Sequence, residues 1–248
     1  MTTIERQLNH RSIRDFTDQS VDEGTIQSLL AVMNRTASSR GLQSCSIIRL
    51  TDQDKKEAIA TIAGQPYIAQ APEVWIFIAD CYRNYTILHE KSAKSNQQPT
   101  LDFLFEAISD SYLAAQNVMV ALESLDLGGV FLGSIMNDLD ALVELLNLPK
   151  FTFPLLGIAF GHVANPSQLK PRMSLDLKVG ENSYPHQYSY TKALENYDKE
   201  MTNYYDTRQH NRRSDSFTDQ VLNHLTAASH KSKSLSTFLQ EQGFILDR

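Results

Sequence analysis

The first stretch that could do chemistry is His10-Arg11-Ser12-Ile13-Arg14, which places cationic and hydroxyl side chains within five residues. Arginine carries a planar fork of donors that suits phosphate oxygens, and the serine hydroxyl adds another donor. The chain as a whole has a formal net charge of −6, so this cluster is a local feature and not part of a basic surface. The stretch predicts an anion-binding site or, alternatively, a solvated helix face.

A second cationic stretch is Lys170-Pro171-Arg172. Proline restricts the backbone, so both cations are held in fixed directions, which lowers the entropic cost of binding an anion. Surface charge without a binding role is the alternative interpretation. A loop with small polar residues, Ser38-Ser39-Arg40 followed by Gln43, adds hydroxyl groups or is simply a loop.

The segment GGVFLGS, residues 128–134, follows a long apolar helical pattern. Its glycines permit close approach of the backbone to a ligand, or end the helix and form a turn. The spacing matches neither G-x-G-x-x-G nor the phosphate-binding loop of nucleoside triphosphatases, which argues against a Rossmann dinucleotide site and against a nucleoside triphosphatase.

Composition and missing motifs narrow the function further. The sequence pI of about 5.6 argues against general affinity for nucleic acid or an anionic membrane. There is no G-x-S-x-G or H-E-x-x-H motif, and the seven histidines lack metal-ligand spacing. If the protein is an enzyme, its reactive group is therefore expected to be a bound cofactor carrying a phosphate.

The two cysteines, Cys45 and Cys81, lie in apolar strand-like runs without C-x-x-C spacing and are interpreted as reduced core thiols. The N-terminal residues lack the apolar run of a signal peptide, and no apolar run of about 18 residues could span a bilayer. We therefore expect a cytoplasmic protein.

Hydrophobic periodicity predicts alternating helices and strands up to about residue 163. A capping box at Ser20–Glu23 begins a helix, Asp52 caps a second helix that ends near Gly64, and Asn137 caps a helix through Leu146. A mostly apolar helix spans 101–125 and is ended by Gly128-Gly129. Strands are expected at 46–51, 73–81, 130–133 and 153–163, and the continuous apolar run of 73–81 indicates burial on both faces.

From residue 165 onward the pattern changes. A basic loop leads to a tyrosine-rich helix over 190–206, and two helices near 217–229 and 234–242 have thin apolar faces. Such helices are unstable alone in water, so they are expected to pack on a partner subunit. We interpret residues 1–165 as the core and 166–248 as an extension of the same domain.

The order of these stretches resembles one family. The sequences HRSIRDFT, LQSCSIIRLTD, AGQPYIAQAPEVWIF, LGGVFLGSIMND, FPLLGIAFGHV, LKPR, ENSY and NRRSDSFTD resemble the FMN-dependent, oxygen-insensitive NADPH nitroreductases, together with related NADPH–flavin oxidoreductases. The resemblance implies an α+β fold with a central mixed sheet flanked by helices. It also implies a homodimer whose C-terminal arm wraps the partner, with FMN at the subunit interface.

The resemblance also assigns residues to the site. The implied FMN-binding residues are His10, Arg11, Ser12, Arg14, Ser38, Gln65, Phe131, Leu132, Gly133, Ser134, Lys170 and Arg172. Lys170 is expected near the flavin ring, whereas Arg172 and Arg11 are expected nearer the phosphate and ribityl chain. Arg208 matches the arginine that holds the 2′-phosphate of NADPH, and His230 is implied near the acceptor. Between Arg208 and Asn211 the chain is one residue shorter than the family pattern.

The implied reaction is hydride transfer from NADPH to FMN and then reduction of an acceptor. Nitroaromatics, quinones, free flavins and azo compounds all fit as acceptors. Two alternatives remain open: a flavin reductase that supplies free reduced FMN, and a binding protein that holds FMN without turnover.

Overall fold

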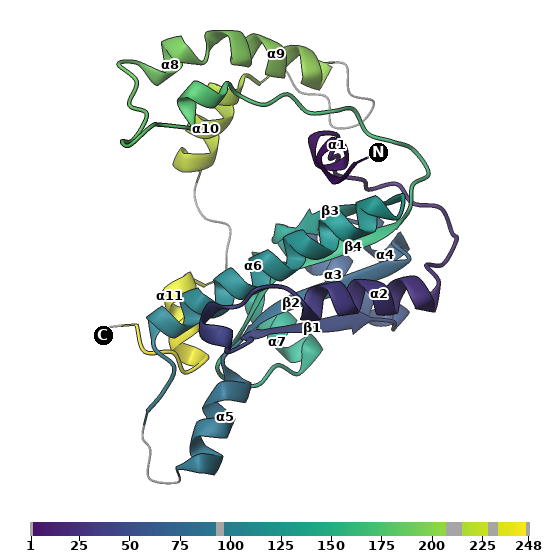
Figure 1. Ribbon diagram of the computed structural model, residues 1–248, viewed down its shortest axis with the longest axis vertical. Helices are drawn as coiled ribbons and strands as arrows, with labels where there is room; N and C mark the ends of the chain where they lie inside the picture. The colour runs from purple at the N-terminus through teal and green to yellow at the C-terminus, as the bar shows by residue number, and fades with distance from the viewer. Residues whose placement is uncertain (1, 93–96, 207–214, 228–232, 247–248) are drawn as a thin grey trace. The chain divides into compact units, whose positions relative to one another are not determined.

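The computed structural model describes residues 2–92, 97–206, 215–227 and 233–246. The chain divides into two compact units, one formed by Met1–Ser167 with His230–Arg248 and the other by Gln168–Ser229. The first unit contains the sheet and most of the helices, and Figure 1 shows the elements of each unit. No helix among the described residues is long and apolar enough to cross a membrane.

The first unit is built on a four-stranded sheet in the order β1-β2-β4-β3. Its strands are β1 (Cys45–Leu50), β2 (Glu73–Asp80), β3 (Leu127–Leu132) and β4 (Thr152–His162). All three strand pairs are antiparallel. The sheet was expected to be mixed, but its four described strands pair only antiparallel. Within the described ranges, parallel pairing occurs at the isolated bridges Ser12–Gly129 and Thr100–Ile245. The α+β class is confirmed.

Helices cover both faces of this sheet. The helices of the first unit are α1 (Thr3–Leu8), α2 (Glu23–Asn34), α3 (Gln53–Ala63), α4 (Tyr67–Gln70), α5 (Tyr82–Lys91), α6 (Leu101–Ser124), α7 (Leu139–Leu146) and α11 (Leu235–Glu241), with the short 3₁₀ turns η1 (Ser39–Gly41) and η2 (Gly133–Asn137). Helices α2 and α6 lie over one face, and α3 and α7 over the other (Figure 1).

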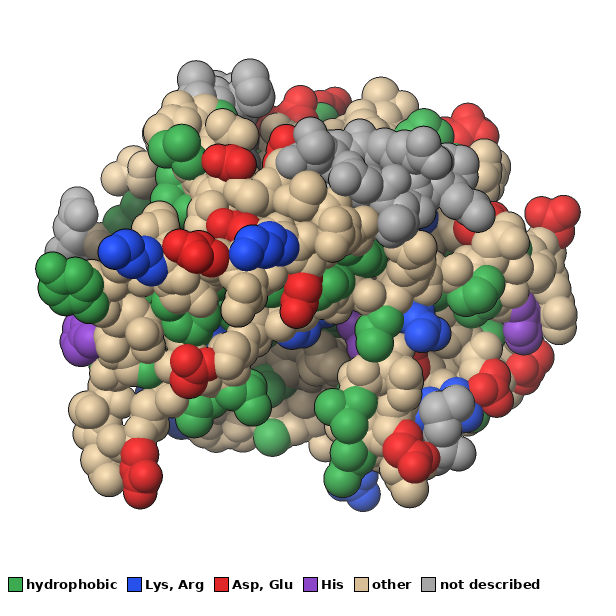
Figure 2. Space-filling model, turned by 90° about the horizontal axis from the view of Figure 1, so that it is seen from above, with side chains coloured by type: hydrophobic (Ala, Val, Ile, Leu, Met, Phe, Trp, Pro, Cys, Tyr) green, Lys and Arg blue, Asp and Glu red, His purple; other side chains and the backbone are tan. Residues whose placement is uncertain are grey.

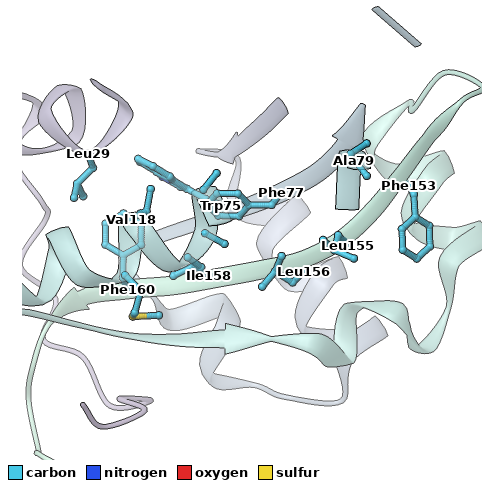
Figure 3. Packing of buried hydrophobic residues seen from close by; sticks show 14 of the residues in the cluster. Leu29, Trp75, Phe77, Ala79, Val118, Phe153, Leu155, Leu156, Ile158 and Phe160 are labelled. Atoms are coloured by element: carbon cyan, nitrogen blue, oxygen red, sulfur yellow. The ribbon is translucent and has the colours of Figure 1, made fainter. Parts of the chain in front are cut away.

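Strand β2 shows why the sheet is buried on both faces. Trp75, Phe77 and Ala79 point toward α2 and α6, and the alternate side chains point toward α3 and α7. Every residue of β2 is buried, which confirms the burial predicted from its apolar run. The Trp75 ring meets Phe160 of β4 edge to face, with the ring centroids 5.2 Å apart (Figure 3).

Several local predictions are confirmed, and two helix caps are corrected. Asp52 caps α3, and Gly64 ends it with a left-handed φ of 62°. Helix α2 is capped by Asp22 and not by Ser20, because the Asp22 carboxylate accepts from the Thr25 N–H at 2.9 Å. Asp138, not Asn137, caps α7 in the same way.

The Gly128-Gly129 pair does not end α6. The helix stops at Ser124 and turns through Asp126, whose φ is 59°, so both glycines lie inside β3. Their role is close approach within the sheet and not capping.

The C-terminal helix α11 also corrects an expectation. Phe238 and Leu239 are buried in the core between the sheet and α6, together with Phe244 just beyond the helix. Lys233, just before α11, pairs with Asp140 of α7 at 2.7 Å. The thin apolar face of this helix therefore packs on its own chain.

The second unit contains α8 (Tyr190–Ala193), α9 (Glu195–Asp206), α10 (Phe217–Thr226) and the 3₁₀ turn η3 (Leu175–Leu177). Asp198 of α9 joins this helix to α10, because its carboxylate accepts from the Thr218 backbone N–H at 3.0 Å and from the Thr218 hydroxyl at 2.6 Å. On α10, the apolar side chains of Val221, Leu222 and Leu225 are exposed to solvent in the single chain.

The described side chains on the face drawn in Figure 2 form no single large field of charge. On the face drawn in Figure 2, acidic and basic side chains are scattered in small groups among hydrophobic ones. This distribution agrees with the modest net charge of −6.

Candidate functional site

The cationic stretch near the N-terminus is fixed against the edge strand β3. Ser12 forms a parallel bridge with Gly129, and the Ile13 N–H donates to the Gly129 carbonyl at 2.9 Å. A Cβ atom at Gly128 would lie 2.6 Å from Cγ1 of Ile13, so only glycine permits this approach. The stretch is thus an added edge segment of the sheet and not a solvated helix face.

His10 is anchored at the C-terminal end of α6. Its Nδ1 lies 2.5 Å from Oε1 of Glu123, and because a carboxylate only accepts, Nδ1 carries the proton and donates. Nε2 is then the nitrogen that remains for a ligand. Arg6 strengthens the same attachment by donating to the Glu123 carbonyl at 2.7 Å and to Asp126 at 2.6 Å.

Two predicted site residues carry buried polar atoms without a partner. Nε of Arg11 and Oγ of Ser134 are both buried, and neither has a hydrogen-bond partner within the described part of the chain. Leaving such a group unpaired costs about 1–3 kcal/mol. Because both atoms can donate, each fits a ligand with phosphate, hydroxyl or carbonyl oxygens, and FMN offers all three.

Gln65 is brought to Arg14 by a tyrosine that the sequence did not single out. The Tyr67 hydroxyl donates to Oε1 of Gln65 at 2.5 Å. Burial raises the pKa of Tyr67, and the Arg14 guanidinium, which is hydrogen-bonded to the hydroxyl, opposes that rise. The only signal for Tyr67 was its place in the quoted stretch AGQPYIAQ.

The end of β3 contributes an apolar hollow. A cavity of about 380 Å³ is lined by Tyr112, Gln116, Phe131, Gly133, Met136, Leu155 and Leu156. Nothing lies within 4 Å of a Cβ built on Gly133, so the backbone there is open to a ligand. The lining suits a flat aromatic ring. Leu132, by contrast, is fully buried in the core toward α3 and α7, so only its backbone is available.

Ser38 lies elsewhere in the first unit. It precedes η1, whose Ser39 N–H donates to the buried Asp110 of α6 at 2.7 Å. His10 contacts the same helix at Glu123. At about 1.5 Å per residue, these two attachment points are roughly 20 Å apart along the helix axis. One chain does not bring Ser38 to His10.

Lys170 and Arg172 belong to the second unit. Arg172 donates from Nη1 to the carbonyl oxygens of Lys170 at 3.0 Å and Pro171 at 3.2 Å, and the Tyr197 hydroxyl donates to Pro171 at 3.3 Å. The loop is thereby tied to α9. Its place in the same site as Arg11 stays a prediction, and Arg208 and His230 lie outside the described residues.

The two cysteines are free, and burial keeps their thiols protonated. Burial raises the pKa of Cys45 to about 11 and that of Cys81 to about 12, so both thiols stay protonated near pH 7. Among the described residues, no group of three or more His, Cys, Asp and Glu side chains is placed to hold a metal ion.

Comparison with known proteins covers the whole chain. The model of the nitroreductase family matches residues 8–162, and that of the nitroreductase family C-terminal domain matches residues 170–247. The chain is 37% identical over 243 residues to an oxygen-insensitive NADPH nitroreductase of Salmonella typhimurium, and 35% identical over 245 residues to an FMN reductase (NADPH) of Bacillus subtilis. Each match covers 98% of both chains.

A solved structure agrees with these matches. The NADPH:FMN oxidoreductase of Vibrio harveyi, determined in complex with NAD⁺, superimposes with a TM-score of 0.87 at 31% identity and 99% coverage of both chains.

Proposed function

The chain belongs to the nitroreductase family, and from this premise we propose that it is an FMN-dependent oxidoreductase that uses NADPH. It transfers a hydride from NADPH to FMN and then reduces an acceptor such as a nitroaromatic, a quinone, a free flavin or an azo compound. FMN, when bound, supplies the redox chemistry because its ring takes up hydride and passes electrons on. The protein is expected to act in the cytoplasm.

The observation that carries this proposal is the pair of unpartnered buried atoms, Nε of Arg11 and Oγ of Ser134. Both residues are implied FMN contacts. Arg11 lies in the cationic stretch that joins β3 at Gly129, and Ser134 lies in η2, directly after β3. Arg11 and Arg14 are expected to hold acceptor oxygens, since a guanidinium only donates. His10 is expected to present Nε2, because Glu123 occupies Nδ1.

The remaining cofactor contacts are proposed from the family resemblance. Lys170 and Arg172 supply further cations toward FMN, and the apolar hollow at Phe131 and Gly133 accepts a flat ring. Arg208 is proposed to hold the 2′-phosphate of NADPH. The backbone N–H groups near Gly133 are proposed to orient the ring.

The first experiment is an absorbance spectrum of the purified protein, followed by anaerobic addition of NADPH and, separately, NADH. We expect flavin bands near roughly 370 and 450 nm that bleach faster with NADPH. Arg11→Ala should weaken FMN binding at least tenfold, whereas Arg35→Ala, at the exposed end of α2, should not. Bands that persist would favour a binding protein, and a chain that cannot be loaded with FMN would exclude the proposal.

A flavin reductase is the second candidate function. It is favoured by the similarity to an FMN reductase (NADPH) over 98% of both chains. An enzyme that supplies free reduced FMN has a higher kcat/KM for FMN than for a nitroaromatic, and a nitroreductase has the opposite order. Measuring both values on one preparation separates the two.

We also propose a homodimer in which two chains build each site and the C-terminal arm wraps the partner subunit. The roughly 20 Å between the attachment points of Ser38 and His10 supports this, because a second chain can supply its own Ser38 to the site that His10 marks. Helix α6 also carries the exposed apolar residues Phe105, Tyr112 and Leu113, whose spacing places them on one face.

Light scattering tests the dimer. Leu113→Glu should shift the mass toward the monomer of 28.0 kDa and weaken FMN binding in parallel. Leu125→Glu is the matched control, since Leu125 is exposed to a similar extent at the end of α6 but off that face. A monomeric wild type with FMN bound would contradict the shared site.

A further inference from the structure

Three polar side chains from two distant segments meet beside α4. The Tyr67 hydroxyl donates to Oε1 of Gln65 at 2.5 Å, and the Arg14 guanidinium is hydrogen-bonded to the same hydroxyl. Tyr67 and Gln65 are half-buried, whereas Arg14 is exposed. Tyr67 thus stands between a cation and an amide.

The chemistry of these groups sets the direction of every hydrogen bond. A guanidinium has donors only, so Arg14 must donate to the phenol oxygen. The phenol O–H is then left to donate, and the acceptor within reach is the Gln65 carbonyl oxygen. This order holds whichever way the amide is drawn, because the opposite orientation would turn the Gln65 NH₂ donor toward the phenol and leave the phenol O–H without that acceptor.

The backbone beneath the amide is also held. The Gln65 N–H donates to the Ala60 carbonyl at 2.9 Å, and its own carbonyl accepts from the Ile68 N–H at 3.1 Å. Beyond α4, the Lys56 ammonium donates to the carbonyl oxygens of Ala71 at 3.0 Å and Pro72 at 2.9 Å. The amide can therefore rotate only about its own side chain, and the hydrogen bond from the Tyr67 hydroxyl acts on that side chain.

We propose that Tyr67 is a positioning residue that fixes the Gln65 amide so that Gln65 presents only N–H donors to its ligand. The ligand atom opposite Gln65 must then be a hydrogen-bond acceptor, such as a carbonyl oxygen, a phosphate oxygen or a ring nitrogen, and a ligand donor at this position is disfavoured. The inference rests on the proposed function in that it takes FMN as this ligand. Tyr67 acts through Gln65 and needs no contact with FMN itself.

A double-mutant cycle on FMN affinity tests the proposal in the full-length chain. Tyr67→Phe keeps the ring and removes the hydroxyl, and it should raise the FMN Kd roughly tenfold, the size of one hydrogen bond. Gln65→Met should raise the Kd by at least as much. The double variant should match Gln65→Met alone, because Tyr67 has nothing left to orient.

A purely structural role for Tyr67 predicts the other result. The loss from Tyr67→Phe would then persist undiminished in the Gln65→Met background, and that outcome overturns the proposal. An unchanged Kd in Tyr67→Phe overturns it as well. Tyr188→Phe, at a fully exposed tyrosine of the second unit, is the control and should bind FMN as the wild type does.

A second measurement does not depend on FMN. In the full-length chain labelled with ¹⁵N-glutamine, the Gln65 side-chain NH₂ pair is identified by its loss in Gln65→Met. We expect a pair shifted from those of exposed glutamines in the wild type and moved to their position in Tyr67→Phe. Identical pairs in both proteins would overturn the proposal. If the shift is seen but the wild type does not bind FMN, the amide orientation stands and the proposed function fails.

Discussion

The two halves of helix α6 hold different parts of the molecule by different means. In the N-terminal half, Asp110 is only 3% exposed and accepts from two backbone N–H groups, those of Ser39 at 2.7 Å and Ser44 at 3.1 Å. At the C-terminal end, Glu123 accepts from the His10 side chain. One carboxylate thus fixes a backbone path, and the other orients a side chain.

The two carboxylates therefore contribute to different properties, one to the stability of the fold and the other to ligand binding. A buried carboxylate that satisfies backbone donors stabilises the fold, because its removal leaves those N–H groups unpaired away from water. A partly exposed pair between side chains contributes little to folding but selects one orientation of a side chain. Removing the Asp110 carboxylate should therefore mainly lower stability, and removing the Glu123 carboxylate should mainly weaken ligand binding.

The largest effect is expected for Asp110→Ala. Two backbone donors lose their acceptor, so the free energy of unfolding should fall by about 2–4 kcal/mol. Asp110→Asn keeps one acceptor oxygen and should lose clearly less. Denaturant unfolding of the three proteins measures both values. Equal stability of Asp110→Ala and the wild type would contradict the structural role assigned to the Asp110 carboxylate.

An intermediate effect, on binding and not on folding, is expected for Glu123→Ala. Without the carboxylate, His10 is free to rotate, and the FMN Kd should rise about five- to tenfold while the unfolding free energy changes by less than about 1 kcal/mol. Glu123→Gln keeps an acceptor for Nδ1 and should lie nearer the wild type. Flavin fluorescence titration gives the Kd. A loss of stability as large as that of Asp110→Ala would contradict this division of roles.

The smallest effect is expected for Arg6→Ala and depends on pH. Arg6, through its hydrogen bond and its charge, lowers the pKa of Asp126 from the ordinary value of 3.8. The pKa of Asp126 is lower in the folded than in the unfolded protein. The pair therefore stabilises the protein at pH values above the unfolded-state pKa and loses this contribution as the pH falls through the folded-state pKa. A small difference in unfolding midpoint between wild type and Arg6→Ala should be present at pH 7 and narrow below about pH 4. It should not vanish, because the hydrogen bond from Arg6 to the Glu123 carbonyl does not depend on pH. A difference that stays constant down to pH 3 would contradict the assignment.

Much of the local structure could be predicted from the sequence. The apolar run of 73–81 predicts a strand buried on both faces, and Asp52 and Gly64 mark the ends of α3. The cap of α2 was misplaced by two residues, because Ser20 and Asp22 both have capping side chains and only the folded backbone selects Asp22. The two C-terminal helices share thin apolar faces, yet α11 packs in its own chain's core while α10 keeps exposed apolar residues.

The sequence by itself determined the α+β class, the family and the cationic stretch His10–Arg14, because each depends on residue types and on order along the chain. Only the tertiary structure decided that His10 meets Glu123, that Ser12 joins β3 at Gly129, and that Tyr67 stands between Arg14 and Gln65. Apart from Gln65 and Tyr67, which are neighbours along the chain, these partners are far apart in sequence, and local spacing carries no information about which distant groups meet. They come together because packing brings the N-terminal segment, β3 and α6 into contact and leaves few orientations in which their buried polar groups are paired.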